Sequence, residues 1–73
     1  MSYKEQQELA GLPKKIEQLE ADIAELHQAM AQADFYKQAG DVIAREQGRL
    51  QELEASLTDA YGRWELLEQL AET

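Results

Sequence analysis

Residues 8–30 read ELAGLPKKIEQLEADIAELHQAM, and their spacing indicates the fold. Large apolar side chains recur here at alternating steps of three and four residues, at Leu9, Leu12, Ile16, Leu19, Ile23, Leu26 and Met30. This spacing places them on one stripe of a helix and is typical of the a and d positions of a coiled coil. Gly11 and Pro13 interrupt the stripe, and neither residue favours a helix interior. The stretch therefore predicts a coiled coil with a broken beginning.

A second repeat follows a polar stretch and completes a hairpin. Its a positions are Ile43, Leu50, Leu57 and Trp64, and its d positions are Leu53, Ala60 and Leu67. Antiparallel coiled coils place a positions against d positions of the facing helix. One register, in which facing residue numbers add to 76, pairs Ala33 with Ile43, Leu26 with Leu50, Ile23 with Leu53, Leu19 with Leu57, Ile16 with Ala60, Leu12 with Trp64 and Leu9 with Leu67. The poor layer of Met30 with Glu46 predicts fraying at the tip.

We predict an all-α fold, an antiparallel two-helix coiled-coil hairpin with a short N-terminal helix packed at its base. Pro13 suits the first turn of a helix, and Gly11 suits the end of a preceding one. The predicted boundaries within a single domain over residues 1–73 are a short helix at about 3–10, a helix at about 13–33, a turn at about 34–41 and a helix at about 41–70. Asp41 is the predicted N-cap of the last helix. The short helix is expected to lay Tyr3 and Leu9 near Tyr61, Trp64 and Leu67.

Composition narrows the functional class. The 73 residues include 15 acidic and 7 basic side chains, giving a net charge of -8. The surface as a whole therefore does not attract nucleic acid or anionic lipid. No run approaches the ~18 apolar residues of a membrane span, and no secretory signal is visible. Cysteine is absent, which excludes disulfides and fits a reducing compartment. We expect a cytoplasmic domain with no membrane partner, monomeric in isolation.

No residue pattern typical of catalysis, metal binding or cofactor binding is present. His27 is the only histidine and lacks a second ligand one turn away, so it is predicted to be a solvated flank residue. Carboxylates such as Glu17, Glu20 and Glu25 are spread over exposed helix faces, where raised pKa values are not expected. The chain is therefore predicted not to be an enzyme.

The few basic residues form two groups in the predicted register. One group lies at the base and consists of Lys14, Lys15, Arg63 and Lys4; the other lies toward the tip and consists of Lys37, Arg45 and Arg49. Either group could contact phosphates. The alternative is that these side chains serve helix solubility and i,i+4 pairing. Gly48 and Gly62 fall in mid-helix, where they either allow close approach of the other helix or are simply tolerated.

Three stretches resemble a known family. Residues 2–20, SYKEQQELAGLPKKIEQLE, resemble an opening of the form SYKEQ-EL--LP--IE-LE. Residues 33–38, ADFYKQ, resemble a D-FY element found at a hairpin tip, and residues 60–70, AYGRWELLEQL, resemble a Y-RWE-LE ending. In their order and spacing, the three stretches resemble those of the C-terminal coiled-coil domain of the ABC-F ATPases, most closely of the Uup branch.

The resemblance implies a larger cytosolic ATPase of which this chain is the C-terminal tail. Its ATP sites would lie in two cassettes outside the chain, so no cofactor or catalytic residue carries over. The resemblance also implies DNA binding, for which the seven basic residues named above are the candidate contacts, or contact with ribosomal RNA. Because a net charge of -8 is a poor match to a tight DNA binder, we expect this contact to be weak and without sequence preference. The alternative is a structural or regulatory coiled coil that docks on the ATPase cassettes, a ribosome or another protein. A third hypothesis is self-association of two hairpins through the tip. The sequence alone does not distinguish DNA from RNA as the ligand.

Overall fold

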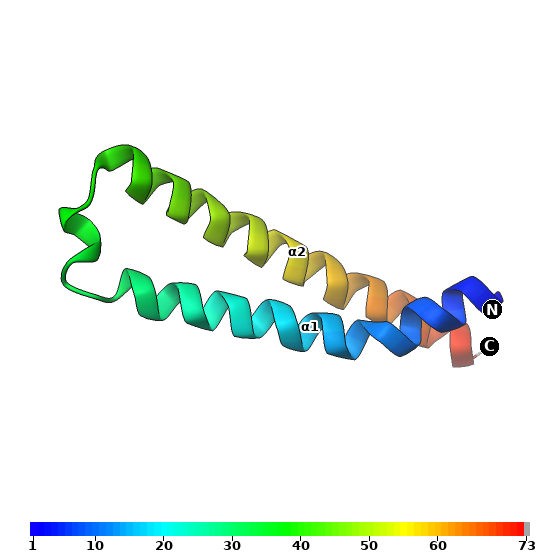
Figure 1. The fold of residues 1–73 in the computed structure, drawn as a ribbon. Coiled ribbons are helices and arrows are strands. Elements are labelled where there is room, and N and C mark those ends of the chain that lie inside the picture. The colour runs from blue at the N-terminus through cyan, green and yellow to red at the C-terminus, as the bar shows by residue number, and fades with distance from the viewer. Residues whose placement is uncertain (73) are drawn as a thin grey trace.

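The computed structural model describes residues 1–72 and contains two long helices joined by a short connector (Figure 1). Helix α1 spans Tyr3–Met30, the 3-10 helix η1 spans Phe35–Lys37, and helix α2 spans Gly40–Glu72. The two long helices run antiparallel and bring the start of α1 and the end of α2 to one end of a rod of 53 × 17 × 15 Å. The predicted all-α helical hairpin is confirmed.

Helix α1 begins with a capping box. The Ser2 hydroxyl accepts a hydrogen bond from the Glu5 amide at 3.2 Å, and the Glu5 carboxylate accepts one from the Ser2 amide at 2.9 Å. The second of these bonds, from the Ser2 backbone, lowers the pKa of Glu5 below its ordinary value. Two amides that would otherwise lack partners are thereby satisfied, which fixes the start of the helix.

The predicted break before Pro13 is wrong. Helix α1 continues through Gly11 and Pro13, and Gly11 does not adopt the left-handed conformation of a helix end. Proline removes the amide that would bond the Leu9 carbonyl and crowds that carbonyl, so such helices bend rather than stop. Figure 1 shows α1 changing direction between its blue and cyan parts. Burial of Leu12 and Ile16, on either side of Pro13, holds the two parts in one helix.

The hydrophobic core lies mainly in the half of the rod near the termini. Its buried members are Leu12, Ile16, Ala60 and Leu67, with Leu9, Leu19, Leu57 and Trp64 packed against them. This cluster holds both members of four predicted layers. It does not include Tyr3, which is 76% exposed, so the predicted contact of Tyr3 with the base aromatics is wrong. Tyr3 directly follows the N-cap Ser2, in the first turn of α1.

The connector differs in detail from the predicted turn. Helix α1 ends at Met30 rather than near residue 33, and α2 begins at Gly40, which places Asp41 inside its first turn rather than at the N-cap. A carboxylate in that turn still complements the positive end of the helix dipole. Phe35, the first residue of η1, is only 4% exposed and is the buried residue of the connector. Its ring meets that of Tyr36 edge-on, with centroids 5.0 Å apart.

Candidate nucleic-acid interface

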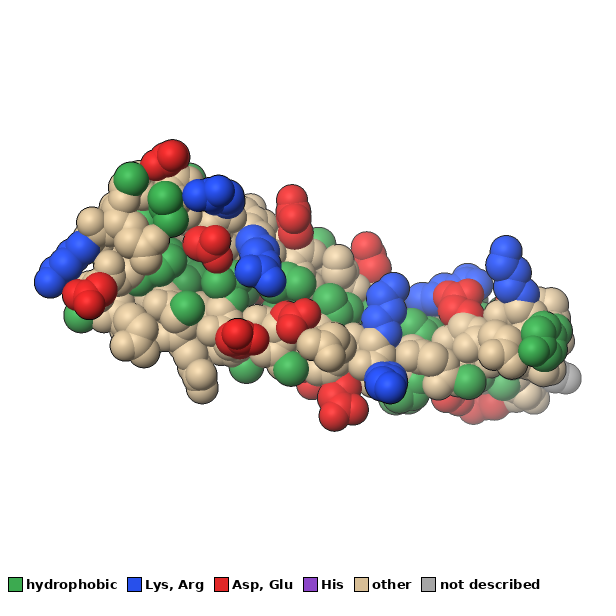
Figure 2. Space-filling view, in the orientation of Figure 1, with side chains coloured by type: hydrophobic (Ala, Val, Ile, Leu, Met, Phe, Trp, Pro, Cys, Tyr) green, Lys and Arg blue, Asp and Glu red, His purple; other side chains and the backbone are tan. Residues whose placement is uncertain are grey.

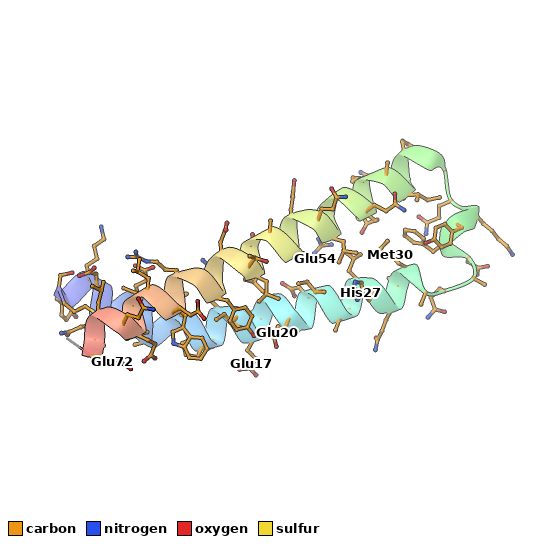
Figure 3. The ribbon with its side chains drawn as sticks, turned by 180° about the vertical axis from the view of Figure 1, so that it is seen from behind. Glu17, Glu20, His27, Met30, Glu54 and Glu72 are labelled. Carbon is orange, nitrogen blue, oxygen red and sulfur yellow. The ribbon has the colours of Figure 1, made fainter. Side chains whose placement is uncertain are left out.

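Two flanks run along the hairpin on either side of the hydrophobic seam. Residues at heptad positions c and g of both helices form what we call the g flank, and residues at positions b and e form the e flank. Contacts across the seam agree with this division. Arg63 meets Glu8 on the g flank, whereas His27 lies 4.0 Å from Glu54 on the e flank. Figure 3 shows His27 and Glu54 facing each other between the helices.

Charge is divided unequally between the flanks. The g flank carries five basic side chains, Lys4, Lys15, Arg45, Arg49 and Arg63, and five acidic ones, Glu8, Asp22, Glu25, Glu52 and Asp59. The e flank of residues 1–72 carries no Lys or Arg and six carboxylates, Glu17, Glu20, Glu54, Glu65, Glu68 and Glu72. In Figure 2, Lys and Arg side chains are distributed along the visible face, interspersed with Asp and Glu. The net charge of -8 therefore resides largely on the e flank, and the g flank is close to neutral.

Arg63 is held in a two-point ion pair. Its Nε lies 2.6 Å from Oε2 of Glu8, and its Nη2 lies 3.0 Å from Oε1 of the same carboxylate. These hydrogen bonds hold the pKa of Glu8 below its ordinary value and raise the pKa of Arg63. Both side chains remain partly exposed, and three of the five guanidinium N–H donors are outside the pair. Arg63 thus links the two helices at the base of the hairpin and has three further N–H donors that the ion pair does not use.

Lys15 lines the same groove as Arg63, whereas Lys14 does not. Lys15, Arg63 and Glu8 line one shallow groove across the seam, together with Ser56. Lys14 lines a separate depression on the outer side of α1 with Glu17, Gln18 and Ala21. Neighbouring residues on a helix point about 100° apart, because a turn contains 3.6 residues. The structure therefore brings together two members of the predicted base group and separates a third.

The predicted tip group is also divided. Arg49 lines a depression on the g flank with Asp22, Glu25 and Glu46. Lys37 lies in η1 and pairs with Asp34 at 3.4 Å, and both side chains are largely exposed. Such an exposed pair contributes little to stability and leaves the cation available to solvent. Within residues 1–72, Lys4, Lys14, Lys15, Arg45 and Arg49 have no carboxylate within 4.0 Å.

Aromatic side chains and carboxylates meet on the e flank. The Tyr61 hydroxyl donates a hydrogen bond to Glu20, which raises the pKa of Tyr61. The Trp64 indole N–H donates to Glu68 at 3.0 Å. The two rings lie with centroids 6.4 Å apart and planes tilted by 36°. Glu20 and Glu68 are thus acceptors that fix the ring orientations.

Sequence reasoning missed the partners Glu8 and Glu20. The heptad pattern contains information about these partners, because an antiparallel coiled coil sets g positions against g positions and e positions against e positions. Applied to the predicted register, that rule leaves two neighbours for each residue, positions 63 and 70 for Glu8 and positions 54 and 61 for Glu20. The structure pairs Glu8 with Arg63 and Glu20 with Tyr61. Within residues 1–72, no group of three or more His, Cys, Asp or Glu side chains could hold a metal ion. In the same range, neither helix is apolar over a stretch long enough to cross a bilayer.

Comparisons with known proteins agree with the resemblance seen in the motifs. The model of the ABC transporter C-terminal domain family matches residues 1–69. The chain is 42% identical over 69 residues to two Haemophilus influenzae proteins, "ATP-binding protein Uup-like" and "ATP-binding protein Uup". It is 37% identical over 70 residues to "ATP-binding protein Uup" of Escherichia coli. These alignments cover 94–96% of this chain but only 11–15% of the relatives. No solved structure matches.

Proposed function

Because the chain belongs to the ABC transporter C-terminal domain family and resembles the Uup proteins, we propose that it is a non-catalytic DNA-binding coiled coil. It contacts the phosphate backbone through the g flank, weakly and without sequence preference. In this proposal it serves a larger cytoplasmic ATP-binding protein, whose ATP sites lie outside these residues. Ribosomal RNA offers the same phosphate chemistry, so it is included in the test.

The observation that supports the proposal is the division of charge between the flanks. A net charge of -8 argues against attraction to a polyanion if it is spread evenly. It is not spread evenly, because the e flank carries six carboxylates and the g flank carries five bases against five acids. A phosphate backbone lying along the g flank meets Lys15, Arg49 and the free donors of Arg63. The e flank then faces away from the nucleic acid.

Weak binding follows from the same distribution. Screening acts over about 8 Å at physiological ionic strength, so a phosphate on the g flank is partly shielded from the e flank. Glu8, Asp22 and Glu25 still oppose it at close range. Affinity useful to the cell then depends on tethering, because a covalently linked ATP-binding part that sits on the nucleic acid raises the local concentration of this domain.

The test is fluorescence anisotropy of labelled duplex DNA and of a structured RNA, titrated with the 73-residue chain at low and moderate salt. The variant that probes the g flank is Lys15→Glu with Arg49→Glu. The matched control is Lys14→Glu with Lys37→Glu, which makes the same change in net charge at cations outside the flank. Arg63 is left intact, because its loss would also unpair Glu8 at the base.

We expect binding that weakens with salt, is abolished by the g-flank variant and is only modestly weakened by the control. Each phosphate contact removed should reduce the slope of log K against log salt by about 1. Equal losses in both variants would mean that only net charge matters and would remove the g flank as the interface. Absence of binding at low salt would contradict the proposal and leave a docking coiled coil as the function. Preference for the RNA would shift the ligand from DNA to RNA on the same flank.

A further inference from the structure

A shallow groove on the e flank near the end of α2 has features that the nucleic-acid proposal does not use. Trp64, Glu65, Glu68 and Gln69 line it, and the indole of Trp64 supplies an apolar wall. Trp64 also packs against the core cluster, so part of its side chain is held by the core while part lines the groove. We call this surface the Trp64 groove. An aromatic side chain held at the edge of a core is a preformed contact surface.

Hydrogen bonds orient the aromatic wall. The indole N–H bonds Glu68 at 3.0 Å, and the neighbouring Tyr61 ring is held through its hydroxyl by Glu20. Both bonds use carboxylates, so negative charge lies at the edges of both rings. A cation over such a ring gains from the negative face of the ring and from the adjacent carboxylates together. The geometry is therefore suited to a positively charged side chain.

The charges around the groove identify the chemical class of its occupant. The e flank carries six carboxylates and, within residues 1–72, no Lys or Arg, so cations of the chain itself do not compete for the site. Nucleic acid and anionic lipid are repelled by such a surface. A planar guanidinium stacks on an indole and donates to two carboxylates at once, which suits Glu65 and Glu68. A protein segment bearing arginine is the partner that satisfies both features.

We propose that the Trp64 groove is the docking site for an arginine-bearing segment of a protein partner. The hairpin then has two interaction surfaces on opposite flanks, the g flank for phosphates and the Trp64 groove for a basic protein surface. The two proposals are independent, because they rest on different residues and different ligands. Either can fail while the other holds.

The chain contains a single tryptophan, so its fluorescence reports directly on the groove. The experiment titrates the 73-residue chain with acetyl-hexaarginine amide and follows Trp64 emission at moderate salt. The groove variant is Glu65→Gln with Glu68→Gln, which keeps an acceptor for the indole N–H and removes two charges. The matched control is Glu52→Gln with Asp59→Asn, which removes two charges from the g flank. Circular dichroism checks that both variants stay helical.

We expect saturable quenching or a spectral shift, with Kd raised about five- to tenfold in the groove variant and less than about twofold in the control. A hexalysine peptide should bind more weakly, because ammonium lacks the planar stacking of guanidinium. Equal weakening in the two variants would mean diffuse attraction to an acidic rod and would overturn the proposal. An unchanged Trp64 signal, with peptide binding detected by NMR shifts elsewhere on the chain, would overturn it as well.

Discussion

Glu8 gives the ion pair at the base of the hairpin a measurable titration signature. Two hydrogen bonds from Arg63 lower the pKa of this carboxyl in the folded chain. In the unfolded chain it titrates near the ordinary value of about 4.3. Since the folded value is the lower one, the pair contributes stability above the ordinary pKa. That contribution is lost as the pH falls through the lowered folded value.

Replacing Arg63 with Gln should return the pKa of Glu8 toward its ordinary value, because both guanidinium hydrogen bonds disappear. The measurement is a carboxyl-carbon NMR titration of the wild-type and variant chains. Glu5 serves as the internal control, since its lowered pKa depends first on Ser2 and should change little. A Glu8 pKa that stays low without Arg63 would show that another group provides the stabilisation.

Phe35 and Tyr36 offer a matched pair of adjacent aromatic residues at the tip. Phe35 is 4% exposed and Tyr36 is 64% exposed. We expect Phe35→Ala to lower the free energy of unfolding by about 3 kcal/mol, as for other buried aromatics. Tyr36→Ala should change it by no more than about 0.5 kcal/mol, as is usual at exposed positions. Urea denaturation followed by circular dichroism measures both, and similar values for the two variants would mean that Phe35 does not brace the tip.

Helix α2 contains two glycines that the packing of this chain does not require. A methyl group added at Gly48 or Gly62 would meet no heavy atom within 4 Å, and neither residue has a positive φ. Close approach of α1 is therefore not the reason for them. The double variant Gly48→Ala with Gly62→Ala should raise the free energy of unfolding by about 1–2 kcal/mol, since each change reduces the entropy of the unfolded chain.

Urea titrations of the two single variants and the double variant give the measurement, and the two gains should add because the sites lie 14 residues apart. Gly40→Ala, at the start of α2, is the control and should give a smaller gain because helix ends are less ordered. Destabilisation by the mid-helix changes would contradict the open space found around both glycines.

The heptad spacing was sufficient to predict both long helices, their antiparallel arrangement and the core residues that lie in the helices. The predicted break at Pro13 failed because it followed the local preference of proline rather than the heptad spacing, which continues through Leu12 and Ile16; burial of those two residues favours one helix. Phe35 was predicted at the tip but not in the core, since it lies outside the repeat and its burial depends on how the helices diverge. The start at Ser2 was readable from the S-x-x-E spacing of the capping box.

The candidate interface was predictable only in part. The sequence identifies every basic residue, but the prediction grouped them by their position along the length of the hairpin and so placed Lys14 in one group with Lys15. The structure separates them, because successive residues of a helix face different directions. The two flanks follow from the same heptads once positions c and g are distinguished from b and e. The direction in which each side chain points, rather than its height along the hairpin, therefore determines the shared surface.

The division of charge should also govern how the whole molecule responds to salt. Six carboxylates without Lys or Arg on the e flank repel one another, and the two ion pairs that Lys and Arg form within residues 1–72, Arg63 with Glu8 and Lys37 with Asp34, involve none of these six. Raising NaCl from about 20 mM to about 500 mM shortens the Debye length from about 20 Å to about 4 Å. Repulsion between carboxylates spread along the flank is then screened more strongly than the close contact of Glu8 with Arg63.

We therefore expect Tm to rise with NaCl in thermal unfolding followed by circular dichroism. The double variant Glu54→Gln with Glu65→Gln on the e flank should show a weaker dependence of Tm on NaCl, because part of the repulsion is already removed. Neutralising Glu52 and Asp59 as Gln and Asn on the g flank should not reduce it, since those carboxylates lie among five cations. Sodium sulfate at equal ionic strength separates screening from salting-out, which also raises Tm but is stronger for sulfate. A Tm that falls with NaCl would mean that attraction on the g flank outweighs repulsion on the e flank, contrary to this expectation.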